Sequence, residues 1–215
     1  DLHSFPTRRS SDLLSSYALT IAFDLAGDEE RLKVAGERLA ALVEDCGGHV
    51  GTGFAGTPVL TGALTRTGHT AETYRLLLED TCPSWLYAVT MGVTTTWERW
   101  DSMLPDGSIN PGGMTSFNHY ALGAVAAWLE REVAGLAPAQ PAYRVIEVAP
   151  RPGPGLTSAQ AVHRTPFGWA ASAWRVDDDG ITVEVVVPVG ARARVSLPGA
   201  ATPVELSHGR HTLTA

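Results

Sequence analysis

One stretch of the sequence combines the residue types that a carbohydrate-processing enzyme needs. Residues 94–101 read Thr-Thr-Thr-Trp-Glu-Arg-Trp-Asp, so Glu98 lies between Trp97 and Trp100 and beside Arg99. The flat apolar face of a tryptophan can stack on the C–H face of a pyranose ring, and a glutamate can take up or release a proton. This stretch predicts a carbohydrate site in which Glu98 performs acid–base chemistry.

A second polar cluster follows at residues 116–120, which read Ser-Phe-Asn-His-Tyr. The imidazole of His119 could hydrogen-bond a sugar hydroxyl. Asn118 could contact the sugar as well, or it could serve only to brace a loop. We expect His119 and Asn118 to belong to the same site as Glu98, although His119 could also be a hydrogen-bonded core residue.

Structural roles for the first stretch stay open at this point. Glu98 could be a surface ion-pair partner of Arg99. Trp97 and Trp100 are three residues apart, so in an extended segment they cannot point to the same side. At least one of these two tryptophans is therefore expected to pack in the core.

Composition excludes several classes of protein. The chain has 215 residues, 44% of them apolar, which is enough for one large domain or two small ones with a real core. The net charge is −7 without a long basic run, which argues against a nucleic-acid surface. No apolar run is long enough for a membrane span. Cys46 and Cys82 lack metal-ligand spacing, so we expect two free, partly buried thiols, with a disulfide as the alternative. We expect no metal site and no cofactor.

A glycine-rich segment at residues 51–58 could be mistaken for a phosphate-binding loop. It reads Gly-Thr-Gly-Phe-Ala-Gly-Thr-Pro, and it has neither the preceding strand nor the lysine of such a loop. We therefore predict no phosphate site there, and expect Pro58 to begin a helix.

The elements that must position these residues change character near residue 137. Before it, apolar residues recur with helical spacing, and we expect helices at 14–25, 58–66 and 117–129. We expect two more helices, one capped by Asp28 that runs to 46 and stops at Gly47-Gly48, and one capped by Thr70 that runs to 78, with a short apolar piece at 85–89. After it, prolines and short alternating runs predict strands near 143–148, 158–163, 169–176, 181–187 and 193–197, with a further hairpin from 204–206 and 211–214. Trp169 and Trp174 should lie on opposite faces of their strand.

These patterns predict two domains of α + β class. Helical hairpins packed side by side, as in part of an (α/α)6 barrel, should occupy residues 14–136. An antiparallel β-sandwich should occupy residues 137–215. Residues 1–13 are polar and unpatterned, and they read as a non-native tail.

Four segments in this order resemble the bacterial α-L-rhamnosidases. They are residues 53–58, 83–87 and 95–100, and residues 116–129 with His119, Gly123 and Trp128. The resemblance implies an (α/α)6 barrel followed by a C-terminal β-sandwich. It also implies hydrolysis of terminal non-reducing α-L-rhamnose from glycosides or polysaccharides, with inversion.

The resemblance assigns roles to individual residues. Glu98 matches the family's general base, and His119 matches a histidine that contacts the sugar. We expect Trp97 and Asn118 to contribute to substrate binding too. The family's general acid belongs to an Asp- and Arg-rich loop well upstream, and no segment of this chain matches it. We therefore expect the chain to be the C-terminal part of a larger enzyme, inactive by itself without the missing N-terminal part of the polypeptide.

Two alternatives remain. The chain could belong to another α/α-barrel glycosidase with a different sugar specificity. It could also be a non-catalytic carbohydrate-binding fragment, which aromatic residues clustered on one exposed sheet face would favour. The compartment, the aglycone and the oligomeric state are not indicated by the sequence.

Overall fold

The computed structural model describes residues 13–215, and it divides into two compact units that meet between Val125 and Ala126. The first unit holds α1 (Leu14–Ala22), α2 (Glu29–Asp45), α3 (Thr57–Arg66), α4 (Thr70–Leu78), α5 (Trp85–Thr90) and the 3-10 helix η1 (Ala121–Ala124). The predicted tail at residues 1–13 lies outside the described residues except for Leu13. Among the described helices, none is long and apolar enough to cross a membrane.

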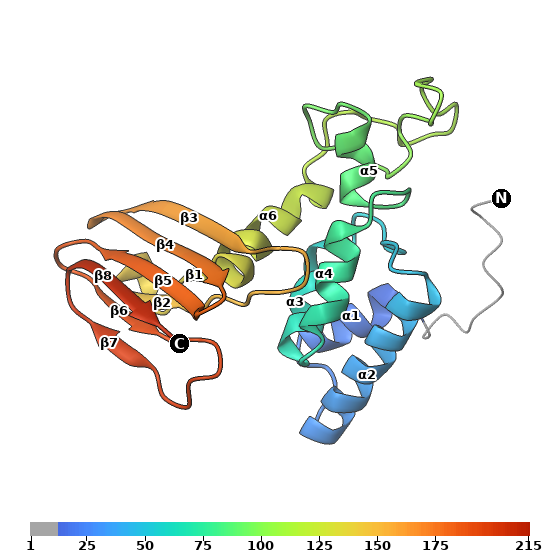
Figure 1. Cartoon of the computed structure of the whole chain (residues 1–215). Helices are drawn as coiled ribbons and strands as arrows, with labels where there is room; N and C mark the ends of the chain where they lie inside the picture. Colours follow the sequence, from blue (N-terminus) through green and yellow to red (C-terminus); the bar gives the residue numbers. More distant parts are fainter. Residues whose placement is uncertain (1–12) are drawn as a thin grey trace. The chain divides into compact units, whose positions relative to one another are not determined.

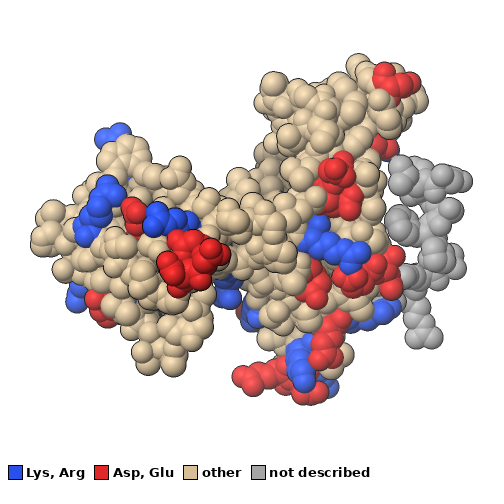
Figure 2. All heavy atoms as spheres, in the orientation of Figure 1, with Lys and Arg blue, Asp and Glu red and all other residues tan. Residues whose placement is uncertain are grey.

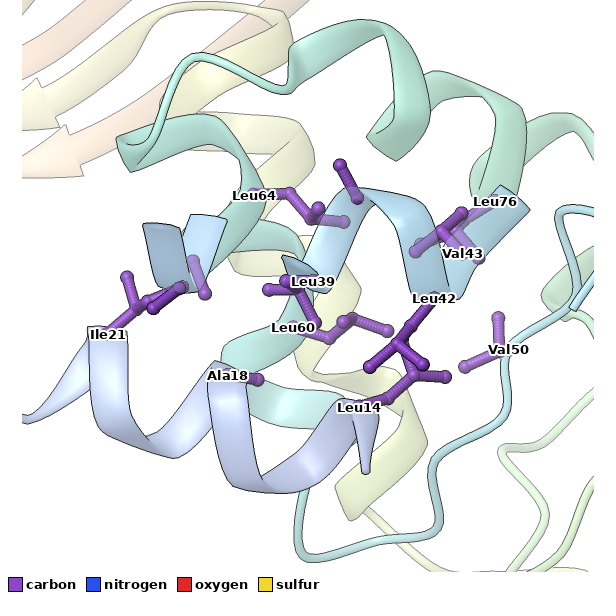
Figure 3. Close-up of a cluster of buried hydrophobic side chains, with 13 residues drawn as sticks. Leu14, Ala18, Ile21, Leu39, Leu42, Val43, Val50, Leu60, Leu64 and Leu76 are labelled. Atoms are coloured by element: carbon purple, nitrogen blue, oxygen red, sulfur yellow. The ribbon is translucent and has the colours of Figure 1, made fainter. Parts of the chain in front are cut away.

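The core of the first unit joins four helices (Figure 3). Leu14, Ala18 and Ile21 line one face of α1 at the predicted spacing and are buried. They pack with leucines and valines on the inward faces of three other helices, which are Leu39, Leu42 and Val43 of α2, Leu60 and Leu64 of α3, and Leu76 of α4. The side-by-side helices confirm the predicted helical class of this half.

Local sequence signals account for the ends of several helices. Asp28 caps α2 by accepting a hydrogen bond from the backbone N–H of Arg31 at 2.8 Å, as its position before two glutamates suggested. Gly47 and Gly48 then end this helix with positive φ angles. At α4 the expected cap is wrong by one residue, because Thr70 is already helical and His69 occupies the cap position.

The predicted helix at residues 117–129 is wrong in its first part. Helical structure begins only at Ala121, as η1, and continues through α6 (Val125–Trp128) into the π-helix η2 (Leu129–Val133). Phe117 and His119 lie in a loop whose backbone bonds to another segment, since the His119 N–H donates to the Thr96 carbonyl. Because this hydrogen bond holds the segment outside the helix, Tyr120 does not lie on a buried apolar helix face. Tyr120 is 88% exposed.

The second unit begins within α6, includes η2, and continues as a module of two sheets (Figure 1). One sheet has the order β1 (Leu136–Pro138), β2 (Val145–Val148), β6 (Arg192–Val195), β7 (Val204–Leu206), and the other has the order β3 (Ser158–Thr165), β4 (Gly168–Asp177), β5 (Gly180–Val187), β8 (Gly209–Thr214). Each sheet buries one face, so the predicted helical half followed by a β-sandwich is confirmed.

Long-range pairing differs from the expectation in two places. The β2–β6 pair is parallel, whereas the other strand pairs of the described sheets are antiparallel. The predicted hairpin of residues 204–206 and 211–214 is wrong, because β7 pairs with β6 and β8 pairs with β5 in the other sheet. The two segments lie in different layers because register and partner depend on which face each strand buries, which a local pattern does not show.

The two tryptophans of β4 lie on opposite faces, as their spacing predicts. Trp174 is 3% exposed, and its indole N–H donates to the Val133 carbonyl at 2.6 Å. Trp169 is 60% exposed. The sandwich therefore carries no pair of aromatic rings on one face of this strand.

Candidate active site

The sequence-predicted site residues lie in the long loop that connects α5 to η1. Two segments of this loop run beside each other and are joined by backbone hydrogen bonds. The Glu98 N–H donates to the Ser116 carbonyl at 2.9 Å, and the His119 N–H donates to the Thr96 carbonyl at 2.8 Å. The tertiary structure thus brings the Trp-Glu-Arg-Trp segment and the Asn-His-Tyr segment together, as the sequence analysis expected.

Glu98 has a half-buried side chain whose carboxylate is held from one side. Its Oε2 accepts a hydrogen bond from the backbone N–H of Ser116 at 3.2 Å. Within the described part of the chain, no basic side chain forms an ion pair with Glu98. The carboxylate therefore keeps acceptor capacity that the protein does not use.

Arg99, the neighbour of Glu98, pairs with a different carboxylate. Its Nε lies 2.5 Å from Oδ1 of Asp101, and its second terminal nitrogen lies 3.0 Å from Oδ2. The remaining terminal nitrogen donates to the Gly113 carbonyl at 3.2 Å. Such a two-pronged contact is the preferred geometry of an arginine–carboxylate pair. The interpretation of Glu98 as a surface partner of Arg99 is therefore wrong.

Four aromatic rings in and beside this loop form two edge-to-face pairs. Trp97 is 4% exposed and lies with its ring centroid 5.4 Å from that of Phe117. Trp100 lies 5.4 Å from Trp85, again edge to face, and its indole N–H donates to the Thr52 carbonyl at 2.8 Å. Both tryptophans of the motif thus pack against the protein. Substrate binding by Trp97 stays a prediction, and its visible role is to support the segment that carries Glu98.

His119 is half-buried, and one of its ring nitrogens is already used. The backbone N–H of Ala121 donates to Nδ1 at 3.3 Å, so the neutral imidazole carries its hydrogen on Nε2. The ring stacks on Tyr120 with centroids 5.3 Å apart and lies 5.8 Å from the Phe54 ring. Nε2 is then an N–H donor suited to a sugar hydroxyl.

Asn118 lies between the two site residues in the loop and has an exposed side chain. Its backbone N–H donates to the Ser116 hydroxyl at 3.1 Å. Its predicted contact with substrate stays a prediction.

Sequence reasoning missed several neighbours of the site. The ring of Phe54 lies near that of His119, although the sequence assigned this residue of the glycine-rich segment no place in the site. Ser116 holds the Glu98 carboxylate through its backbone, which no residue pattern reveals. The Asp101–Arg99 pair could have been suspected from two opposite charges two residues apart.

Cys82 interacts electrostatically with Asp101 and Arg99 of the same loop, and a raised pKa keeps its thiol neutral. Burial, and to a smaller extent the Asp101 carboxylate, raise the pKa of this thiol to about 11, while the nearby Arg99 acts in the opposite direction. Cys46 and Cys82 are both half-buried, and neither is part of a disulfide bond among the described residues.

Comparisons with known proteins identify both halves of the chain. Residues 7–133 match the bacterial alpha-L-rhamnosidase 6 hairpin glycosidase domain, and residues 135–212 match the bacterial alpha-L-rhamnosidase C-terminal domain. The chain is 44% identical over 187 residues to an α-L-rhamnosidase of Streptomyces avermitilis and 41% identical over 184 residues to one of Formosa agariphila. These matches cover 87% and 86% of this chain, but 18% and 20% of the relatives. The chain thus spans about a fifth of their length.

Solved structures give the same picture. The native α-L-rhamnosidase of Aspergillus terreus matches with a TM-score of 0.90 and 43% identity, over 94% of this chain and 24% of that one. The Streptomyces avermitilis enzyme complexed with L-rhamnose matches with a TM-score of 0.89 and 38% identity, over 96% of this chain and 22% of that one. With both of its halves matched, this chain belongs to the bacterial α-L-rhamnosidase family.

Proposed function

We propose that this chain forms the C-terminal part of a larger α-L-rhamnosidase, and that Glu98 is its general base. The whole enzyme would hydrolyse terminal non-reducing α-L-rhamnose from glycosides or polysaccharides with inversion. The observation that carries the proposal is the position of the Glu98 carboxylate. One oxygen is held by the Ser116 N–H, while the adjacent Arg99 is occupied by Asp101.

An inverting hydrolase needs two carboxyl groups with different tasks. One protonates the leaving oxygen, and the other, ionised, takes a proton from water on the opposite face of the sugar, at a separation of about 6.5–9.5 Å. Glu98 suits the second task, because its carboxylate meets a neutral N–H donor on Oε2 and Oε1 has no hydrogen bond to a described residue. A water at Oε1 would give its proton to Glu98 as its oxygen attacks the anomeric carbon.

His119 suits a binding role. Because Nδ1 accepts from Ala121, Nε2 can donate to a sugar hydroxyl without a change of tautomer. The rings of Phe54 and Tyr120 on either side limit how the imidazole can rotate. The buried Trp97, next to Glu98 in sequence, and Asn118, next to His119, would shape the sugar-binding pocket.

The acid is not assigned within this chain. Asp101 is bound on both oxygens by Arg99, and Oδ2 also accepts from Asn110. Asp106 is exposed and accepts from the Ser108 hydroxyl and N–H. Neither carboxyl group is placed like an acid poised to protonate a leaving group, which agrees with the expectation of an upstream acid loop.

The alternative of a carbohydrate-binding fragment has less support. It calls for clustered aromatic rings on one sheet face, and β4 exposes Trp169 while Trp174 is buried. Acidic and basic side chains are interspersed on the face shown in Figure 2, with no large basic area that would suggest a polyanionic partner. The other alternative, an α/α-barrel glycosidase with a different sugar specificity, would use the same base. Hydrolysis rates on rhamnosides and on other glycosides distinguish it from an α-L-rhamnosidase.

The test uses a hybrid enzyme in which residues 14–215 replace the aligned segment of the Streptomyces avermitilis α-L-rhamnosidase. The hybrid should release rhamnose from an aryl α-L-rhamnoside. Glu98→Gln should lower kcat by about 10²–10⁴-fold, because the carboxylate that accepts the proton is gone. Azide, a nucleophile that needs no base, should partly restore cleavage and give the inverted glycosyl azide. Near-normal turnover of Glu98→Gln, or a folded hybrid without turnover, would overturn the proposal.

A further inference from the structure

The segment that holds Glu98 has little regular structure of its own. Between α5 and η1, the described secondary structure is limited to turns, bends and one isolated bridge between Met103 and Ile109. The Ser116 N–H that holds the Glu98 carboxylate belongs to this irregular stretch. The hydrogen bond from the Glu98 N–H to the Ser116 carbonyl joins the two segments at one point, and a second connection would hold them in one orientation.

A network around Arg99 supplies this connection. Arg99 donates to both oxygens of Asp101 on its own segment and to the Gly113 carbonyl on the facing one. Asp101 Oδ2 also accepts from the Asn110 side-chain amide at 2.8 Å. The Asn110 carbonyl oxygen in turn accepts from the Gly112 N–H at 2.9 Å. Residues 99, 101 and 110 thus join the base segment to the segment that leads to Ser116.

Burial makes this network stronger than an ordinary surface ion pair. The side chains of Arg99 and Asp101 are 29% and 16% exposed, so water screens the pair only in part. The network also depends on the absence of a side chain at Gly112. A Cβ added to Gly112 would lie 2.9 Å from the Arg99 guanidinium and 3.1 Å from the Asn110 oxygen, whereas one added to Gly113 would meet nothing within 4 Å.

We propose that Asp101, through Arg99 and Asn110, is a positioning residue that holds the Glu98 carboxylate in its reactive orientation. This inference rests on the proposed role of Glu98 and adds the groups that fix its geometry. None of the three side chains needs to touch substrate. Their effect is on the rate, because a general base misplaced by about 1 Å can lose on the order of 10²-fold.

The decisive variant is Asp101→Asn in the hybrid enzyme. Asparagine keeps the size of the side chain, but an NH2 donor replaces one of the two acceptor oxygens. This NH2 would face either the Arg99 Nε–H or the two N–H donors that bind Oδ2, so at least one hydrogen bond would be lost. We expect kcat to fall about 10- to 100-fold with KM within about threefold, because ground-state contacts are unchanged. A raised KM with unchanged kcat would overturn the inference, because a misplaced base lowers the rate and leaves binding intact.

A double-variant cycle separates positioning from an independent effect. If Asp101 acts through Glu98, then Glu98→Gln/Asp101→Asn should be no slower than Glu98→Gln within about threefold. If the two losses multiply, Asp101 acts elsewhere and the inference fails, while the proposed function stands. If Glu98→Gln itself retains turnover, the proposed function fails first.

The 215-residue chain provides a structural readout without catalysis. Asp101→Asn should speed amide hydrogen exchange at Ser116 and Glu98 by about tenfold or more, with amides of α2 unaffected. Asp106→Asn is the matched control, because this nearby carboxylate is exposed and bonds only to Ser108 among the described residues. Unchanged exchange at Ser116 in Asp101→Asn, or an equal change in Asp106→Asn, would contradict the inference.

Discussion

Arg99 forms its two-pronged ion pair with Asp101, two residues along the chain, and the adjacent Glu98 has no cationic partner among the described residues. An arginine bound to Glu98 would occupy the oxygens that a water must reach in the proposed reaction. Arg99 instead connects Asp101 to the Gly113 carbonyl on the facing segment of the loop. This arrangement leaves Oε1 of Glu98 available for the proposed proton transfer.

Gly112→Ala should impair the proposed enzyme, while Gly113→Ala should not. The new methyl at position 112 would press on the Arg99 guanidinium at 2.9 Å, and Arg99 is clamped by Asp101. We expect Gly112→Ala in the hybrid to lower kcat by about tenfold with little change in KM, because moving Arg99 would displace the proposed base. Equal rates for the two variants would contradict this.

Replacements of His119 should separate its two ring nitrogens. His119→Gln places an amide N–H near the Nε2 position, whereas His119→Asn keeps only an acceptor near Nδ1 for the Ala121 N–H. Loss of one hydrogen bond costs about 0.5–1.5 kcal/mol, so Asn should raise KM by up to about tenfold. Gln should bind rhamnose better than Asn does. Competition by L-rhamnose measures this, and the opposite order would exclude Nε2 as the donor.

The 215-residue chain alone should release no rhamnose at an enzyme-like rate. It contains the proposed base but no match to the family's acid loop, and a missing general acid costs about 10²–10⁴-fold. The measurement is release of a chromophore from an aryl α-L-rhamnoside, with the hybrid as positive control. Turnover comparable to the hybrid would show that a carboxyl group of this chain serves as the acid.

Cys82 should react slowly with alkylating reagents at neutral pH. The thiolate is the reactive form, and a pKa of about 11 leaves little thiolate near pH 7. Because the shift is upward, the alkylation rate should rise about tenfold per pH unit from about pH 8 to 10. Asp101→Asn should increase the rate at fixed pH, since the carboxylate raises the pKa of Cys82. Mass spectrometry of the Cys82 peptide follows the reaction, and a plateau below about pH 9 would contradict the assignment.

Trp174→Phe should destabilise the sandwich, with Trp169→Phe as the matched control on the same strand. The first change removes a buried N–H and leaves the Val133 carbonyl without its donor. We expect a loss of about 1–3 kcal/mol in the free energy of unfolding. The exposed Trp169 should tolerate the change within about 0.5 kcal/mol. Urea unfolding compares the two, and equal losses would refute the burial argument.

The sequence by itself determined most of the local structure, and it supplied the residues of the proposed site. Periodic apolar residues fixed α1 and α2, and Asp28 and the Gly47–Gly48 pair marked helix ends, because these signals act over a few residues. The alternating runs located most strands for the same reason. The residue types around Glu98 and His119 indicated carbohydrate chemistry before any fold was known.

Only the tertiary structure decided which residues contact each other across the chain. The apolar spacing of residues 117–129 predicted a helix, yet the Phe117 carbonyl accepts from the Thr95 hydroxyl and the His119 N–H donates to the Thr96 carbonyl. Strands β7 and β8 looked like a hairpin but joined different sheets. Arg99 chose Asp101 over Glu98 because a bidentate contact could form there. Each outcome depends on which of several possible partners offers the better geometry in the folded chain, and a local sequence pattern does not contain that information.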